Sequence, residues 1–317
     1  NHVSEHYDAM YIGHMDTVFP DGTAEKRPFR IEGENYYGPG VGDMKNGDLA
    51  MFHIAANLPE TEKKCLNIAM VYNPDEEIGS IYSKEITDRI GCQADHIFVM
   101  ESAGKNGTRH CFARKGSLTY DIEFQGQAAH AGFMFEVENA SAVLEMGHYI
   151  VELMSLADRE KDTTVNVGIA NGGTARNVVA DHAKISVEMR FRDDSERIRL
   201  KEYVNKITEG QPFVPGVKTT ITMQKETPPF IKTEEAKKYI ERVRKIAEEH
   251  GIPFEEKDRG GLSDANHLSR CGKAIVMDGM GPHGANDHSE KEYGYIGSVE
   301  PCVKLHLAIL NDMLNKQ

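Results

Sequence analysis

The sequence has no long uninterrupted run of apolar residues. Within its 317 residues, no stretch approaches the roughly 18 apolar residues that a membrane-spanning helix requires. Internal repeats and low-complexity tracts are absent as well, and the hydrophobic content of 39% and charged content of 27% are those of a soluble globular protein. We therefore expect no membrane partner, and the length, which exceeds one usual hydrophobic core, predicts two domains.

Positive charge and cysteine are both scarce. The chain has 37 lysines and arginines against 50 aspartates and glutamates, a net charge of −13 that disfavours nucleic acid as a partner and mainly promotes solubility. Its five cysteines form no Cys-x-x-Cys pair. This pattern predicts reduced, mostly structural thiols and a cytoplasmic protein.

A histidine and an aspartate end the apolar segment at residues 11–18, Tyr-Ile-Gly-His-Met-Asp-Thr-Val. His14 and Asp16 are two residues apart, and alternation along an extended chain puts both side chains on the same side. One of them can bind a metal while the other orients it or its neighbours by a hydrogen bond. The pair alone is weak evidence, because polar residues are common where strands end.

Four further segments carry potential metal ligands. They are a glycine-rich turn at 37–47, the end of the strand-like segment 66–72, the end of the apolar segment 97–101 and a glycine-rich loop at 279–289. The side chains that they contribute are Asp43, Glu76, Glu77, Glu101, His283 and His288. Polar residues that follow buried strands lie on the rim where α/β proteins build their sites, so we expect these side chains to converge.

The order of these motifs resembles that of the co-catalytic zinc metallopeptidases. This family includes glutamate carboxypeptidase, acetylornithine deacetylase, succinyl-diaminopimelate desuccinylase, tripeptidase T and the carnosinases, and the chain is most similar to the glutamate carboxypeptidase-like branch. The shared motifs are His-x-Asp-Thr-Val, Gly-x-Gly-x-x-Asp-Met-Lys, Asp-Glu-Glu-x-Gly-Ser and a late glycine-rich His-Ser. Relatives carry a further helix and strand before the first motif, so we expect this chain to lack such a segment, in which any targeting signal would lie.

The periodicity of the chain predicts a two-part organisation. Up to about residue 110, apolar strands alternate with helical stretches, at 47–58 and 78–90, as in a mostly parallel sheet covered by helices. The next part predicts an antiparallel sheet with two helices on one face. Its expected strands are 117–124, 164–170, 183–192 and 218–224, and its expected helices are 139–158 and 194–209. After a hinge at 226–229 the first pattern returns, with helices at 232–250 and 299–315.

This organisation agrees with the fold that the resemblance implies. We expect an α/β fold of the zinc aminopeptidase type, in which a mostly parallel sheet is sandwiched by helices. An α+β lid, a four-stranded antiparallel sheet with two helices, is inserted into it. The expected domains are 1–111 (catalytic, first segment), 112–224 (lid and dimerisation) and 225–317 (catalytic, second segment).

The resemblance also implies a dinuclear centre with two Zn²⁺ per chain, for which Co²⁺ or Mn²⁺ are possible substitutes. Asp43 would bridge the two ions. His14 and Glu101 would complete one site, and Glu77 and His288 the other. Peptide and amide hydrolysis need a strong nucleophile and a charge sink for the oxyanion, and two such ions can provide both.

Three supporting roles follow from the same resemblance. Glu76 would be the general base that acts on the bridging water, and Asp16 would orient His14 by a hydrogen bond. A cis peptide bond is expected between Asp43 and Met44. His283 competes with His288 for the late ligand position, but His288 precedes the serine of the motif, so His283 is expected to hydrogen-bond within its loop.

The lid contributes further candidates. His130, in the motif Gly-x-x-x-His-Ala-Gly, would stabilise the oxyanion, commonly in the partner subunit's site of a homodimer formed through the lid. Asn177 and Arg190 would hold a substrate carboxylate, and Arg192 on the same strand face remains an alternative to Arg190. Asp264, in a further matching motif, is expected to be structural.

Glu101 helps to choose among activities, because tripeptidase and carnosinase branches usually have aspartate at this position. The leading hypothesis is a zinc-dependent carboxypeptidase or N-acyl-amino-acid deacylase that acts on a small peptide or N-acyl amino acid. The alternative is a di- or tripeptide aminopeptidase of the same fold. A non-catalytic relative should have lost ligands or Glu76, and this chain has kept them.

Overall fold

The chain forms two compact units in its computed structural model, which describes residues 4–60 and 65–315. Unit 1 comprises Asn1–Arg114 and Phe230–Gln317, and unit 2 comprises Lys115–Pro229. Each unit has a buried hydrophobic core of its own. All five cysteines are free, and no helix of the described part is long and apolar enough to cross a membrane.

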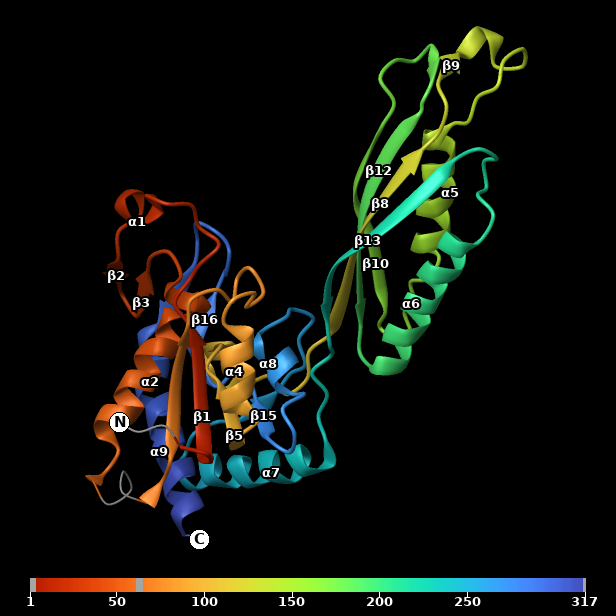
Figure 1. Cartoon of the computed structure of the whole chain (residues 1–317). Coiled ribbons are helices and arrows are strands. Elements are labelled where there is room, and N and C mark those ends of the chain that lie inside the picture. The colour runs from red at the N-terminus through yellow and green to blue at the C-terminus, as the bar shows by residue number, and fades with distance from the viewer. Residues whose placement is uncertain (1–3, 61–64, 316–317) are drawn as a thin grey trace. The chain divides into compact units, whose positions relative to one another are not determined.

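A four-stranded parallel sheet lies at the centre of unit 1 (Figure 1). Its strands, in order across the sheet, are β15 (Ile275–Met277), β5 (Ala94–Val99), β1 (Tyr7–His14) and β4 (Ile68–Asn73). The side chains of β1 alternate between two cores, since Ala9 and Tyr11 belong to one, and Met10 and Ile12 to the other. Burial on both faces explains why these strands are continuously apolar.

Helices cover both faces of this sheet. On the side of Tyr11 lie α2 (Asn46–Asn57), α7 (Glu234–Glu249) and α9 (Val299–Leu314), and on the other side lie α4 (Lys84–Gly91) and α8 (Asp264–Leu268). The predicted helix at 78–90 is wrong in its first half, because α4 begins only at Lys84. Gly79 and Ser80 have positive φ angles, which a helix does not tolerate.

A second sheet of unit 1 is largely antiparallel and short-stranded. Its order is β2 (Arg30–Glu32), β3 (Asn35–Tyr37), β17 (Tyr293–Tyr295), β16 (Gly281–Ala285) and β6 (Ser102–Ala103). The predicted loop at 279–289 therefore contains a strand, β16, which pairs with β17 and β6. Smaller elements complete the unit. They are α1 (Thr23–Lys26), β7 (Arg109–His110), β14 (Glu255–Glu256), and the turns η1 (Val41–Lys45), η2 (Lys105–Gly107) and η4 (Ile296–Ser298).

Unit 2 is a four-stranded antiparallel sheet with two helices on one face (Figure 1). The sheet order is β10 (Thr164–Gly172), β12 (His182–Phe191), β8 (Gly116–Gln125) and β13 (Lys218–Thr227). The helices are α5 (Ala142–Met154) and α6 (Asp194–Glu209). Two short strands, β9 (Ala129–His130) and β11 (Val178–Val179), form a small antiparallel pair, and the turn η3 (Ala131–Phe133) follows β9. The fold class predicted from the sequence is confirmed, although β13 extends into the expected hinge.

Candidate metal centre

The carboxyl ends of the parallel strands bring distant parts of the sequence together. His14 is the last residue of β1 and pairs with Asn73, the last residue of β4, so the turn with Glu76 and Glu77 begins beside it. β5 runs parallel to β1 on the other side, and Glu101 follows two residues after its end. Parallel strands thus deliver a histidine and three glutamates to one edge of the sheet.

Asp43 enters this edge from the glycine-rich turn η1. Its Oδ1 lies 3.1 Å from His14 Nε2, and its Oδ2 lies 3.0 Å from His288 Nε2. His288 lies in the loop between β16 and β17 and has a φ angle of 61°. The two oxygens of one carboxylate therefore face histidines from opposite ends of the chain.

Glu101 and Glu77 complete the cluster. Glu101 Oε1 lies 3.6 Å from His14 Nε2, and Glu77 Oε2 lies 3.3 Å from His288 Nε2. The other oxygen of Glu77 is buried without a hydrogen-bond partner among the described residues. The cluster therefore offers imidazole nitrogens and carboxylate oxygens, including one oxygen that has no other partner among the described residues. Zinc binds such donors, so the residues fit the metal that the resemblance implies.

The crowding of these groups shifts their titration. Burial and the neighbouring Asp43 raise the pKa of Glu77 to about 7. Burial, together with Glu101 and Asp264, raises the pKa of Glu76 well above its ordinary value. Burial acts to lower the pKa of His14, but hydrogen bonds to nearby carboxylates outweigh burial and raise it. Burial and the neighbouring carboxylates thus disfavour the charged forms of Glu76 and Glu77, and a cation bound there would favour them.

Asp16 supports both His14 and the acidic turn. Its Oδ1 lies 3.4 Å from His14 Nδ1, and its two oxygens accept the backbone N–H groups of Glu76 (3.2 Å) and Glu77 (2.9 Å). Burial raises the pKa of Asp16, but the hydrogen bonds from His14 and Glu77 outweigh burial and lower it. One carboxylate thus ties the end of β1 to the turn after β4.

Asp264 also supports the turn that carries Glu76 and Glu77, through contacts that the sequence did not reveal. Its side chain accepts hydrogen bonds from Asn73 Nδ2 at 2.7 Å and Ser80 Oγ at 2.5 Å, the residues that flank the turn. His267 lies 3.0 Å from it on the same helix, α8. Asp264 is buried, and these partners satisfy its charge. The expectation of a structural role agrees with these contacts.

Two predictions concern the loops around Asp43 and His288. The cis peptide bond predicted between Asp43 and Met44 is confirmed. The prediction for His283 is wrong in one respect, because it does not bond within its own loop. Its Nδ1 lies 2.9 Å from the Ala103 carbonyl on the neighbouring strand β6. The sequence could not reveal this pairing, because a glycine- and proline-rich segment does not look like a strand.

Two supporting residues in these loops were missed. Ser102 Oγ donates to the Gly42 carbonyl, and Glu292 accepts backbone N–H groups of the turn that carries Asp43. Ser102 could have been noticed because it follows Glu101 directly. Glu292 had no comparable signal, since a glutamate four residues after a histidine is unremarkable in a chain this acidic.

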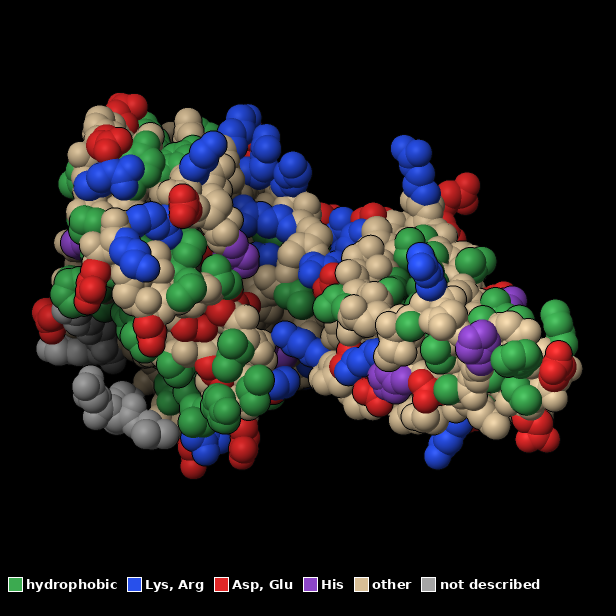
Figure 2. Space-filling view, turned by 90° about the horizontal axis from the view of Figure 1, so that it is seen from above, with side chains coloured by type: hydrophobic (Ala, Val, Ile, Leu, Met, Phe, Trp, Pro, Cys, Tyr) green, Lys and Arg blue, Asp and Glu red, His purple; other side chains and the backbone are tan. Residues whose placement is uncertain are grey.

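His130 and Asn177 lie next to each other at one end of unit 2. His130 pairs with Val178, and the Ala131 N–H donates to the Asn177 carbonyl at 2.9 Å. The His130 side chain is exposed, as is Phe135 in the following loop. Figure 2 shows histidine and hydrophobic side chains close together on the surface of this unit. This end of unit 2 presents an imidazole among apolar groups.

Arg190 lies at the opposite end of the same sheet. It is the last residue but one of β12, whereas that strand begins at His182, five residues after Asn177. Eight residues of strand separate the two ends, or roughly 26 Å at about 3.3 Å per residue. Arg192, the alternative, lies just past the strand at the same end as Arg190. One chain therefore cannot present Asn177 and Arg190 to the same substrate carboxylate, which is not what we expected from the sequence.

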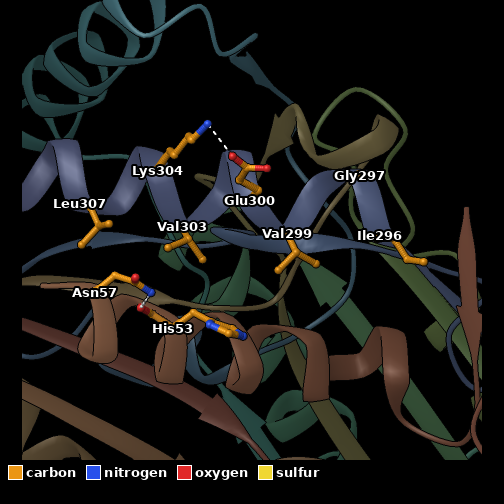
Figure 3. Close-up of a pocket in the computed structure, with 9 residues that line it drawn as sticks. All are labelled: His53, Asn57, Ile296, Gly297, Val299, Glu300, Val303, Lys304 and Leu307. Carbon is orange, nitrogen blue, oxygen red and sulfur yellow. Dashed lines mark hydrogen bonds and ion pairs between the residues drawn. The ribbon is translucent and has the colours of Figure 1, made fainter.

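A separate hollow of about 620 Å³ lies between α2 and α9 (Figure 3). The apolar side chains of Val299, Val303 and Leu307 on α9 face His53 and Asn57 on α2. None of the predicted site residues lines it. The candidate chemistry is therefore concentrated at the carboxyl edge of the parallel sheet.

Fold and site together define the class of protein. A helix-covered parallel sheet with an inserted antiparallel unit, and with histidines and carboxylates at its carboxyl edge, has the architecture of a hydrolase of the metallopeptidase type. The chain belongs to peptidase family M20/M25/M40, whose model matches residues 10–312.

The known proteins similar to this chain include a carboxypeptidase, a desuccinylase and an aminopeptidase. Carboxypeptidase G2 from Pseudomonas sp. (strain RS-16) is 26% identical over 308 residues, 96% of this chain and 73% of that protein. Succinyl-diaminopimelate desuccinylase from Halorhodospira halophila is 24% identical over 323 residues, 96% of this chain and 82% of that protein. The structure of aminopeptidase PepT from Bacillus cereus matches with a TM-score of 0.77 at 24% identity, over 97% of this chain and 81% of that one.

Proposed function

We propose that the chain is a zinc-dependent hydrolase that cleaves a peptide or N-acyl amide bond next to a free carboxylate, as a carboxypeptidase or an N-acyl-amino-acid deacylase. The observation that carries the proposal is the placement of Asp43, whose two oxygens lie 3.1 Å from His14 Nε2 and 3.0 Å from His288 Nε2. A carboxylate in this position is suited to hold two cations at once. The similarity to carboxypeptidase G2 and to the desuccinylase supports the reaction type.

Five side chains would hold the ions. His14 and Glu101 would bind one Zn²⁺, Glu77 and His288 the other, and Asp43 both, with Co²⁺ or Mn²⁺ as substitutes. When bound, the ions would lower the pKa of a water molecule between them and polarise the scissile carbonyl.

Glu76 is assigned the proton transfers. It is adjacent in sequence to Glu77, and burial, together with Glu101 and Asp264, raises its pKa. A carboxylate with a raised pKa is suited to take a proton from water and to return it to the leaving amine near neutral pH. Asp16 keeps the turn and His14 in place during these transfers, through its contacts to the Glu76 and Glu77 N–H groups.

The lid residues are assigned to the substrate, and they support a homodimer. Arg190 would bind the free carboxylate, while Asn177 and His130 would contact the substrate near the oxyanion. Arg190 lies at the far end of β12 from the other two, and the strand between His182 and Arg190 is roughly 26 Å long. Both groups can therefore serve one substrate only if they come from two copies of the chain. Exposed apolar side chains on α5 and β10, including Val151 and Ile169, offer a surface for such a pair. The five free cysteines support a cytoplasmic location.

The test combines metal analysis with a substrate panel. Wild type and Glu76→Gln are assayed for Zn²⁺ content and for hydrolysis of N-acetyl, N-succinyl and glutamyl-terminated substrates. We expect two Zn²⁺ per chain in both proteins, and a 10²- to 10⁴-fold lower kcat, roughly, in the variant, the usual contribution of a general base. Equal activity of the two proteins would remove Glu76 from the mechanism.

The same panel decides between the two candidate activities. Free di- and tripeptides, with and without a blocked amino terminus, are added because a structure similar to this chain is that of an aminopeptidase. An enzyme that requires a free amino terminus, and not a free carboxylate, would replace the carboxypeptidase or deacylase proposal with the aminopeptidase. Two Zn²⁺ without turnover of any substrate would leave the metal centre standing and remove the substrate assignment.

A further inference from the structure

Glu292 is a buried carboxylate without an assigned role, and it contacts the backbone of the turn that carries Asp43. Glu292 is 1% exposed, and its carboxylate accepts three backbone hydrogen bonds from one turn. The Gly40 N–H donates to Oε2 at 2.9 Å, and the N–H groups of Gly42 and Asp43 donate to Oε1 at 2.8 Å and 3.0 Å. Hydrogen bonds to an ionised acceptor are the stronger kind, so this contact holds the turn firmly.

The sheet explains why Glu292 reaches this turn. It precedes β17, which pairs with β3 through Tyr293 and Tyr37, so Glu292 lies beside the chain as it leaves β3 toward Asp43. On its other side β17 pairs with β16, and the loop between these two strands carries His288. Glu292 therefore belongs to the loop of one predicted ligand and holds the turn of another.

The turn has little freedom to find other partners. A Cβ at Gly42 would lie 3.3 Å from the Gly284 Cα and 3.1 Å from the Tyr293 carbonyl oxygen, so the backbone is packed directly against β16 and β17. Gly40 has a φ of 72°, which most side chains do not adopt. Backbone N–H groups enclosed in this way need an acceptor, and Glu292 supplies it for three of them.

We propose that Glu292 is a positioning residue that fixes the Asp43 carboxylate between His14 and His288 before any metal binds. This inference rests on the proposed function of Asp43 as the bridging ligand. A preset carboxylate binds cations more tightly than one that must first be ordered, because the ordering cost is met during folding. Loss of the Glu292 acceptor should therefore weaken metal binding more than it weakens the fold.

The experiment compares Glu292→Gln with a matched variant in unit 2. Glu145 is also fully buried and also accepts backbone N–H groups, from Phe213 at 3.2 Å and Val214 at 2.6 Å, so Glu145→Gln removes a similar anchor far from the predicted ligands in the sequence. Co²⁺ affinity is measured by calorimetry and by the visible absorption of bound Co²⁺. We expect Glu292→Gln to bind Co²⁺ about 10- to 100-fold more weakly, the usual cost of losing a residue that supports a ligand. Glu145→Gln is expected to retain wild-type affinity.

A second measurement does not depend on metal. In metal-free protein, hydrogen exchange of the peptide that spans residues 38–44 is expected to be faster in Glu292→Gln than in wild type. Glu292→Asp, which keeps the charge but is one methylene shorter, replaces the glutamine variant in both measurements if that variant does not fold.

The outcomes separate the inference from the function on which it rests. Wild-type Co²⁺ affinity and unchanged exchange in the Glu292 variant would overturn the inference alone. Equal weakening by Glu145→Gln would also overturn it, because the effect would then be one of general stability. A wild-type chain that binds no Co²⁺ would overturn the metal centre itself, and with it the role assigned to Glu292.

Discussion

Several buried or half-buried carboxylates in this protein are held in position by the backbone N–H groups that donate hydrogen bonds to them. Asp16 accepts from two backbone N–H groups, Glu292 from three and Glu145 from two. Each is held by partners that fix its position. Glu77 differs, because one of its oxygens is buried without such a partner among the described residues. Asp48 and Asp75 have such an oxygen too, but only in Glu77 does it belong to a predicted metal ligand, where it is available for a ligand.

Glu196 allows the energy of a scaffold carboxylate to be measured by pH. Hydrogen bonds from Arg199, and further ones from Lys161 and Thr163, outweigh burial and lower the pKa of Glu196 to about 2. A pKa below the unfolded value, about 4.3, means that Glu196 stabilises the fold above that pH and ceases to do so as the pH falls toward 2. We expect Glu196→Gln to lower the free energy of unfolding by about 2 kcal/mol at pH 7.

Urea unfolding at pH 7 and at pH 3 checks this expectation. The difference between wild type and Glu196→Gln should shrink at pH 3, where the wild-type carboxylate has lost part of its advantage. Glu202→Gln, an exposed site on the same helix, is the control and should change stability by less than about 0.5 kcal/mol. A difference that is the same at both pH values would show that charge is not the cause.

Elements are positioned by close backbone contacts as well as by side chains. Near the start of α2, a Cβ at Gly47 would lie 2.0 Å from the Met100 carbonyl oxygen and 2.6 Å from Met44 Cε. This contact sets α2, which follows Asp43, directly against the chain that leads to Glu101. Only glycine permits so close an approach of two backbones.

A pair of glycine-to-alanine variants tests this contact. Gly47→Ala should lower the free energy of unfolding by about 3 kcal/mol, since backbone atoms must move to admit the methyl group. Gly147 lies inside α5 with nothing within 4 Å of the added Cβ, so Gly147→Ala should raise stability by about 0.5–1 kcal/mol. Thermal and urea unfolding measure both. A neutral Gly47→Ala would mean that α2 is not held by this contact.

Element by element, the sequence predicted what periodicity and caps encode. α6 was predicted with its observed ends, Asp194 and Glu209. In the structure Asp193 caps its first turn, by accepting a hydrogen bond from the Glu196 N–H. The start of α4 was missed because the positive φ angles at Gly79 and Ser80 leave no mark on hydrophobic periodicity. β16 was missed because its glycine and proline residues resemble a loop.

The same distinction holds for the site. Residues at the ends of apolar strands, such as His14 and Glu101, could be nominated from the sequence because strand ends are visible in it. Residues that hold the site together across the chain, such as Asp264 and Glu292, could not. The side-chain partners of Asp264 and the backbone partners of Glu292 lie far away in the sequence, by up to 252 residues, and only the fold brings them together.

At the scale of the whole molecule, both units have a hydrophobic core, but only unit 1 contains the predicted metal ligands. Unit 2 has its own buried core of strand and helix residues. All five predicted metal ligands belong to unit 1. Ligand binding stabilises only the part of a protein that it binds, so the two units should respond differently to the removal of metal.

Calorimetric unfolding with and without EDTA tests this division. We expect two transitions in the metal-loaded protein. EDTA should lower the one that belongs to unit 1, because metal at about 1,000 times its Kd contributes about 4 kcal/mol to stability. For a unit of this size that corresponds to a Tm shift of about 10 °C. The transition of unit 2 should not move.

Gly47→Ala and Glu196→Gln identify the transitions, since each variant should shift only the transition of its own unit. A shift of both transitions by EDTA would mean that the metal, or the interaction of the units, stabilises them jointly. A shift of neither would argue against a metal at the carboxyl edge of the parallel sheet.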